Sequence, residues 1–95
     1  MPGEYALQQS YPNPFNPITT IRYQLPEPSD VNLTIYDLLG QEVKVLVSEM
    51  QPEGWYRVRW DGRDEAGRLV SSGVYLYRLS VEEEFLQTKK MTVVR

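Results

Sequence analysis

The sequence contains neither cysteine nor histidine. The absence of cysteine excludes disulfide bonds and thiolate metal sites, and it leaves the redox compartment undetermined. The absence of histidine removes the commonest general base, the commonest zinc ligand and the usual pH switch near neutrality. No apolar run approaches the roughly 20 residues that a membrane-spanning helix requires. These absences narrow the catalytic and metal-binding chemistry that is open to the chain.

Composition and charge are those of a small folded domain. The 95 residues carry a net charge of −3, with lysine and arginine dispersed among the acids, whereas nucleic-acid binding needs a concentrated basic face. Hydrophobic residues make up 41% of the chain and aromatic residues 12%, and the high share of tyrosine favours β-structure. The length predicts one domain, whose core leaves little room for a buried active site.

The first 17 residues are rich in proline, which excludes a helix there and makes a central strand unfavourable. We expect residues 1–17 to form an extended lead-in packed on the domain, with Tyr11 and Phe15 at the edge of the core. An aromatic–proline docking motif is the alternative. The start Met1-Pro2-Gly3 suggests that the chain is a piece of a longer protein with any export signal upstream.

Residues 18–95 alternate apolar and polar side chains in short runs, as half-buried strands do. The inward faces are expected to carry Ile21, Tyr23 and Leu25, then Tyr75, Tyr77 and Leu79, and finally Met91 and Val93. Turns are expected at residues 37–40 and 82–84, and a polar loop is expected over residues 48–54. The predicted strands cover residues 18–25, 31–38, 42–47, 55–60, 75–79 and 85–95, with a short strand between the turns at Gly67 and Gly73. The pattern predicts an all-β fold, namely an immunoglobulin-like antiparallel β-sandwich of about seven strands. A small barrel is the alternative.

Residues that could support catalysis do not form a coherent set. Ser71 and Ser72 have no histidine partner, and no glycine-rich loop follows a strand and opens a helix. No pair of acids lies in an apolar setting that would raise a pKa. We therefore expect no catalytic residues, no cofactor and no enzyme activity.

Two weaker site hypotheses concern the middle of the chain. Asp61, Asp64 and Glu65 place three carboxylates within five residues and could hold Ca²⁺, although Arg63 lies between them. A turn held by hydrogen bonds from aspartate side chains to the backbone is the favoured alternative, so we expect no metal. Trp55 is expected outside the core and is the candidate ring for stacking on a sugar, as in a carbohydrate-binding module.

Three groups of residues carry a further signal. The first is the opening Tyr11, Pro12, Asn13, Pro14, Phe15, Asn16 and Pro17. The second lies in the centre, at Gly73, Tyr75, Arg78 and Leu79. The third is the ending Lys89, Lys90, Met91, Thr92, Val93, Val94 and Arg95. Together they span nearly the whole chain and resemble the C-terminal sorting domains of the bacterial type IX secretion system. The central part is also similar to the Ig-like domain of the flagellar hook-capping protein.

The resemblance implies a non-catalytic domain that ends an exported protein, often a hydrolase or an adhesin. It implies transit through the periplasm, transfer across the outer membrane by the type IX machinery, and a final place at the cell surface or outside the cell. A surface processing protease of that system would be a second partner. The residues from Lys89 to Arg95 would then carry the recognition signal. A structural or adhesive Ig-like accessory module beside a secreted hydrolase is the alternative.

There is also a physical reason to expect that the last predicted strand acts as a recognition signal. A terminal strand whose end is free can be added to a partner sheet, and Lys89, Lys90 and Arg95 would orient the encounter through their charge. An ordinary edge strand kept soluble by lysine is the alternative. An exposed terminal strand would also permit a strand-exchange dimer.

Overall fold

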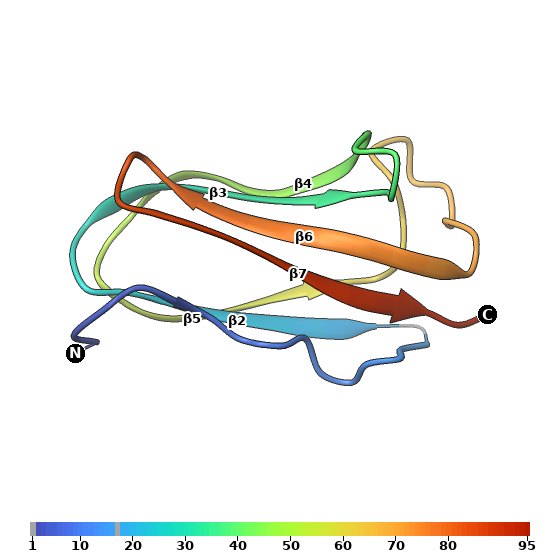
Figure 1. The fold of residues 1–95 in the computed structure, drawn as a ribbon, viewed down its shortest axis with the longest axis horizontal. Helices are drawn as coiled ribbons and strands as arrows, with labels where there is room; N and C mark the ends of the chain where they lie inside the picture. Colours follow the sequence, from blue (N-terminus) through green and yellow to red (C-terminus); the bar gives the residue numbers. More distant parts are fainter. Residues whose placement is uncertain (1, 17) are drawn as a thin grey trace.

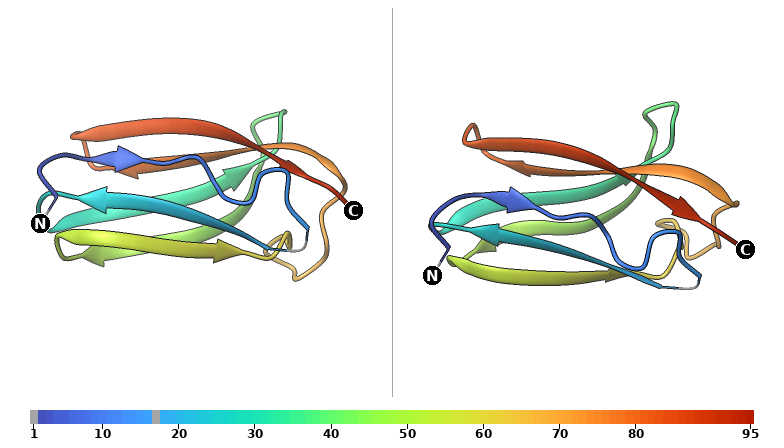
Figure 2. Two further views of the ribbon diagram at one scale, coloured as in Figure 1. Left: turned by 90° about the horizontal axis from the view of Figure 1, so that it is seen from below. Right: turned by 60° about the horizontal axis from the view of Figure 1, so that its bottom comes forward.

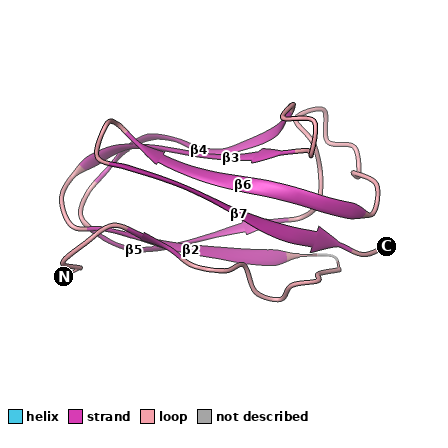
Figure 3. Cartoon of the chain, viewed as in Figure 1, coloured by secondary structure: helices cyan, strands magenta, loops and turns pink. Residues whose placement is uncertain are grey.

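The computed structural model describes residues 2–16 and 18–95, and it confirms the predicted Ig-like β-sandwich. Figure 3 shows strands joined by loops, and the described ranges contain no helix, hence none that could cross a membrane. The strands are β1 (Ala6–Leu7), β2 (Thr19–Leu25), β3 (Ser29–Tyr36), β4 (Glu42–Gln51), β5 (Gly54–Trp60), β6 (Gly73–Val81) and β7 (Phe85–Val93).

Two sheets face each other (Figure 1). One has the order β1-β2-β5 and the other has the order β4-β3-β6-β7. All of these pairings are antiparallel. The molecule measures 37 × 23 × 19 Å, so its two layers enclose a single thin core.

The core is built from the inward positions of alternating strands, as the sequence pattern predicted. Ile21, Tyr23 and Leu25 of β2 lie opposite apolar residues of β3, β6 and β7 across the sandwich. At one end the indole of Trp60 lies between two other rings, with centroids 5.5 Å from that of Phe15 and 5.9 Å from that of Tyr75. Such tilted ring pairs add to the stability that burial itself provides.

Several predicted strand limits were wrong. The fourth strand continues beyond residue 47, because Ser48 and Met50 still pair with Asn32 and Asp30 of β3. The expected loop over residues 48–54 therefore shrinks to residues 52–53. On this outer strand the backbone pairs with β3 while the side chains stay largely exposed. Side-chain polarity therefore did not indicate where the strand ends. The neighbouring β3 begins and ends two residues earlier than predicted, and β7 ends at Val93.

The short strand predicted between Gly67 and Gly73 is absent. Residues 61–72 instead form a compact loop whose pairing in this region is an isolated bridge between Arg63 and Leu69. The loop is held by bonds to itself, such as that from the Asp64 amide to the Arg68 carbonyl at 2.9 Å. Hydrogen bonds within the loop thus form turns where a strand was expected.

The lead-in passes from one sheet to the other. After β1 pairs with β2, Tyr11 bridges Thr20 in antiparallel fashion, and Phe15 then bridges Val93 of β7 in parallel fashion. Figure 2 shows this segment lying between β2 and β7, where it covers one open side of the sandwich. The two-residue strand β1 was not predicted, since its short apolar run does not differ from loop sequence.

The two lead-in rings that were expected at the core edge have different positions. Phe15 is 2% exposed and belongs to the core, as predicted. Tyr11 is 71% exposed, so its predicted packing was wrong. Tyr11 bridges Thr20, and residues bridged in this way project to the same side of a sheet, here the outer side. Met1 and Pro17 lie outside the described residues.

Candidate functional site at the C-terminal strand

The C-terminal strand β7 lies at the edge of the four-stranded sheet. It pairs with β6 from Phe85↔Val81 to Val93↔Gly73. Met91 and Val93 point into the core and are almost fully buried, whereas Lys90 is exposed. The ending therefore has a structural side and a solvent side, which the alternation of residues predicted.

The end of β7 is not free, and this part of the prediction was wrong. The Phe15 amide donates to the Thr92 carbonyl at 3.0 Å, and the Val94 amide donates to the Phe15 carbonyl at 3.1 Å. The Thr92 amide donates to the Asn13 side-chain oxygen at 2.8 Å. The lead-in thus occupies the edge of β7 along its last residues.

A fourth contact between the lead-in and β7 lies two residues earlier in the strand, at Lys90. The side-chain amide of Gln9 donates to the Lys90 carbonyl at 2.7 Å. The lead-in and the C-terminal residues, which contain two of the three groups that carry the resemblance, therefore meet in space. The sequence carried no indication of this meeting, because the partners are about 80 positions apart in the chain.

The first part of β7 keeps an open edge. The Thr92 amide and carbonyl both point away from β6, and alternate residues of a strand repeat this orientation, so the backbone groups of Leu86 and Thr88 point outward too. Within the described ranges no segment pairs with β7 there. The Leu86 side chain beside this edge is 66% exposed. An added strand could bind along these residues.

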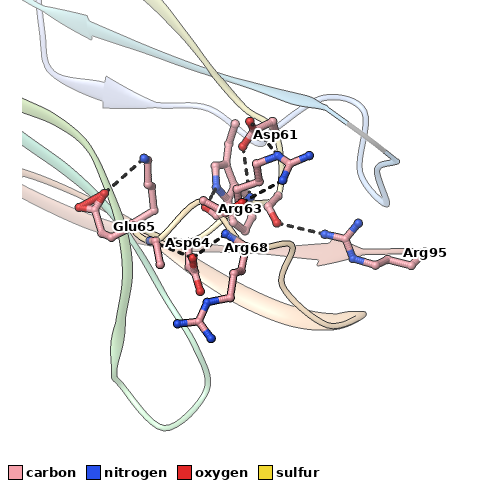
Figure 4. A network of polar contacts seen from close by, with 11 residues as sticks. Asp61, Arg63, Asp64, Glu65, Arg68 and Arg95 are labelled. Atoms are coloured by element: carbon pink, nitrogen blue, oxygen red, sulfur yellow. Dashed lines mark hydrogen bonds and ion pairs between the residues drawn. The ribbon is translucent and has the colours of Figure 1, made fainter.

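Arg95 is fixed to the body of the domain. Its backbone amide donates to the Ser72 hydroxyl at 3.0 Å, and its guanidinium donates to the carbonyl oxygens of Gly62, at 3.0 Å, and Val70. Figure 4 shows the Arg95 side chain beside the loop of residues 61–72. The expectation of a free positive end was therefore wrong for Arg95, whose donors hold this loop.

The carboxylates considered for Ca²⁺ are engaged separately (Figure 4). One Asp64 carboxylate oxygen accepts the amides of Ala66 and Arg68, both at 3.0 Å. Glu65 pairs with Lys44 at 3.3 Å. Asp61 pairs with Arg63 at 3.7 Å. Over residues 2–16 and 18–95 no group of three acidic side chains could hold a metal ion, so the geometry does not support the calcium alternative.

The central motif residues hold the fold together. Leu79 is fully buried, and the Tyr75 hydroxyl donates to the Ser71 carbonyl at 2.8 Å. The Arg78 guanidinium lies 5.2 Å from the centre of the Tyr36 ring, a cation–π contact. Gly73 has φ of 151°, a conformation that side chains disfavour, at the start of β6. These positions shape the sheet on which β7 lies.

Sequence reasoning missed the role of Tyr77. The alternation of residues in this strand correctly predicted that the Tyr77 ring lies in the core. It did not predict that the hydroxyl accepts a hydrogen bond from the Ser10 amide and donates one to the Gln8 carbonyl, both at 2.8 Å. Burial raises the pKa of Tyr77, so this hydroxyl stays protonated. The buried tyrosine thereby pins the lead-in that in turn holds β7.

Two solved structures from Porphyromonas gingivalis have the same fold. Dimeric latent PorU matches with a TM-score of 0.75 and 24% identity over 95% of this chain and 9% of that chain. PorZ, described as an essential bacterial surface component of the type-IX secretion system, matches with a TM-score of 0.58 and 21% identity over 96% of this chain and 11% of that chain. The chain thus spans about a tenth of either protein.

The family comparison bears on the central part of the chain. No curated protein matches the sequence. The family model of the FlgD Ig-like domain matches residues 17–84, which is well over half of the chain. This confirms the predicted relationship to the hook-capping Ig-like domain, and the chain belongs to the FlgD Ig-like domain family.

Proposed function

We propose that this chain is a non-catalytic C-terminal sorting domain that directs its parent protein through the type IX secretion system to the cell surface. The observation that carries the proposal is the junction of Phe15 with Thr92 and Val94, which joins the motif-bearing lead-in to the motif-bearing ending. The junction exists only when the domain is folded, so it offers the secretion machinery a surface at the edge of the sandwich that the unfolded chain lacks.

The solved relatives support this choice over other roles for the fold. The same sandwich occurs in PorU and in PorZ, and PorZ is described as a component of the type-IX secretion system. In both proteins the matched part is about a tenth of the chain, as expected of an accessory domain. A structural or adhesive module is the competing function, since the matching family model is that of the FlgD Ig-like domain and carries no secretion role in its description.

In this proposal the lead-in and the sandwich act as one export unit. The open edge at Leu86 and Thr88 offers backbone hydrogen bonds to a strand of the secretion machinery. Lys90, exposed just beyond it, orients the approach by its charge. The surface processing protease is a further partner in this proposal, and a strand-exchange dimer would use the same open edge.

A reporter fusion tests the proposal. The reporter, preceded by a signal peptide and followed by residues 1–95, is expressed in a host that has this secretion system and in the same host without it. We expect the reporter at the cell surface in the first host and in the periplasm in the second. Folded reporter retained in the periplasm of both hosts would contradict sorting and favour the structural module.

Point variants test whether the open edge of β7 is the recognition surface. Deleting residues 89–95 would remove the buried Met91 and Val93, so loss of export would not distinguish recognition from folding. Thr88→Pro instead removes one outward amide and leaves the pairing with β6 intact. Thr88→Val is its matched control, because both lose the hydroxyl that accepts from Arg78. We expect export to fall for proline alone, at equal thermal midpoints. Equal export of the two variants would show that this edge is not the recognition surface.

A further inference from the structure

The outer side of the β1-β2-β5 sheet carries a surface with an unusual composition for an acidic chain. Along β5 the exposed side chains are Trp55, Arg57 and Arg59, and along β2 Arg22 is exposed on the same side. The strand register places Arg22 opposite Arg57. We call Gln8, Tyr11, Arg22, Trp55, Arg57 and Arg59 the arginine face.

The arginines of this face form no ion pair with any residue that the structure describes. Like charges directly opposite each other on a sheet are destabilising, yet Arg22 and Arg57 are such a pair. The ion pairs found among the described residues are Lys44 with Glu65 and Arg63 with Asp61. None of the three arginines takes part in them. An anion bound between Arg22 and Arg57 would relieve the repulsion, because guanidinium groups bind carboxylates through paired hydrogen bonds.

Aromatic rings lie beside the arginines. Trp55 is 66% exposed and lies opposite Gln24, two residues along from the arginine pair. Tyr11, 71% exposed, bridges Thr20 and so projects on the same side of the sheet. An exposed ring presents apolar area that a ligand can bury, and a flat aromatic ring can stack on the C–H face of a sugar.

A shallow hollow connects Trp55 with the arginine pair Arg22 and Arg57. It has a volume of about 330 Å³ and is lined by Gln8, Arg22, Tyr23, Gln24, Trp55, Tyr56 and Arg57. The side-chain nitrogen of Gln24 donates to the Glu4 carbonyl at 2.9 Å, which leaves its oxygen free to accept a hydroxyl. Gln8, which is exposed, supplies a second side-chain amide. The hollow therefore combines an anion site, a ring and amides that suit hydroxyl groups.

We propose that the arginine face binds an acidic polysaccharide, with a uronic acid carboxylate between Arg22 and Arg57 and a sugar ring on Trp55. A neutral glycan would leave the arginine pair uncompensated. An acidic peptide of glutamate residues has no flat C–H face to stack on the Trp55 ring. A nucleic acid needs a longer basic path than three arginines on a chain of net charge −3. This inference is independent of the secretion proposal.

Titration calorimetry of residues 1–95 with a galacturonic acid hexamer tests the proposal, with a maltose-type glucose hexamer, a hexaglutamate peptide and a thymidine hexanucleotide as comparisons. We expect binding of the galacturonate oligomer and markedly weaker binding of the other three. Equal binding of the peptide or the nucleotide would show a general anion surface and overturn the proposal. So would equal binding of the glucose oligomer, or no binding of galacturonate.

Matched variants locate the site. Arg57→Gln and Trp55→Ala should each weaken galacturonate binding by about tenfold or more. Arg68→Gln makes the same charge change on the loop of residues 61–72, and it should weaken binding less than about twofold. Similar losses for Arg57→Gln and Arg68→Gln would place the effect in the overall charge and contradict the assignment.

A stability measurement separates binding from folding. Because Arg57→Gln removes one member of a like-charge pair, its thermal midpoint should equal or exceed that of the parent chain. Weaker binding at an equal or higher midpoint is then a loss of ligand contacts. A lower midpoint would show that Arg22 and Arg57 do not repel each other, which removes the basis for placing an anion between them.

Discussion

The Tyr77 hydroxyl donates a hydrogen bond of 2.8 Å to the carbonyl oxygen of Gln8, a residue 69 positions earlier in the chain. Tyr77 is fully buried in the middle of β6, whereas Gln8 lies in the lead-in beside β1. This bond and the one from the Ser10 amide fasten the lead-in over the side of the sandwich. The covering segment thereby reaches the end of β7, where we propose that recognition occurs.

Replacing Tyr77 should loosen this fastening. Tyr77→Phe leaves the Ser10 amide and the Gln8 carbonyl without their partner, and we expect unfolding to become easier by about 1–3 kcal/mol. Urea denaturation measures the loss. Tyr11→Phe is the control, because that ring is exposed, and it should change the free energy of unfolding by less than about 0.5 kcal/mol. Equal effects would show that the buried bonds contribute nothing specific.

The position of Phe15 predicts a large effect in a segment that looks like a loop. Phe15→Ala removes a ring that is 2% exposed and lies 5.5 Å from the Trp60 ring, centre to centre. We expect a loss of about 3–5 kcal/mol in the free energy of unfolding, as for other buried aromatic residues. Tyr11→Ala should cost far less. If chemical denaturation gives similar losses for both variants, the lead-in does not dock as described.

Arg95 should stabilise the loop of residues 61–72. Arg95→Ala removes the guanidinium donors from the carbonyls of Gly62 and Val70, so we expect faster amide hydrogen exchange in that loop. The cost in overall stability should be about 1 kcal/mol, because the site is solvent-exposed. Lys90→Ala, the control, removes an exposed cation from β7 and should leave the loop unchanged. Unaltered exchange in Arg95→Ala would refute the anchoring role.

The buried tyrosines predict a loss of stability in alkali. Burial raises the pKa of Tyr23 from its ordinary value of 10.0 to about 12. The unfolded chain then ionises first, so this contribution is complete below pH 10 and disappears as the pH rises through about 12. The free energy of unfolding should fall by at most about 2–3 kcal/mol, because the Tyr23 hydroxyl is only partly buried. Urea denaturation at several pH values measures this fall.

Tyr23→Phe is the control for this pH dependence. It should flatten the alkaline fall, although the raised pKa of Tyr77 leaves part of it in place. An unchanged slope between the parent and Tyr23→Phe would show that Tyr23 ionises in the folded state without penalty.

The alternation of large apolar residues made most of the fold predictable. In β2, β6 and the second half of β7 the predicted inward residues, such as Ile21, Tyr77 and Met91, are all buried. The signal failed in β4, where backbone pairing continues through Ser48 and Met50 without burial. Pairing of an outer strand depends on its neighbour's free backbone groups, and side-chain polarity does not report these.

The candidate site was only partly predictable for a related reason. The motif residues Phe15 and Thr92 could be identified from the sequence, but their contact could not. Hydrogen bonds between backbone groups about 80 positions apart do not depend on which side chains are present. The pattern of residue types therefore does not reveal them. The same applies to Arg95, whose charge suggested a free terminus while its donors in fact hold the carbonyls of Gly62 and Val70.

The amino-acid sequence by itself determined the class of fold, the inward faces of the main strands and the lack of a histidine- or cysteine-based site. These follow from residue type and local spacing, because burial of apolar side chains with a period of two leaves few alternatives. The tertiary structure alone decided that the lead-in clasps the C-terminal strand, that Leu86 and Thr88 keep an open edge, and that Arg22 faces Arg57. Each of these depends on strand register and sheet order, which join residues far apart in the chain through backbone hydrogen bonds.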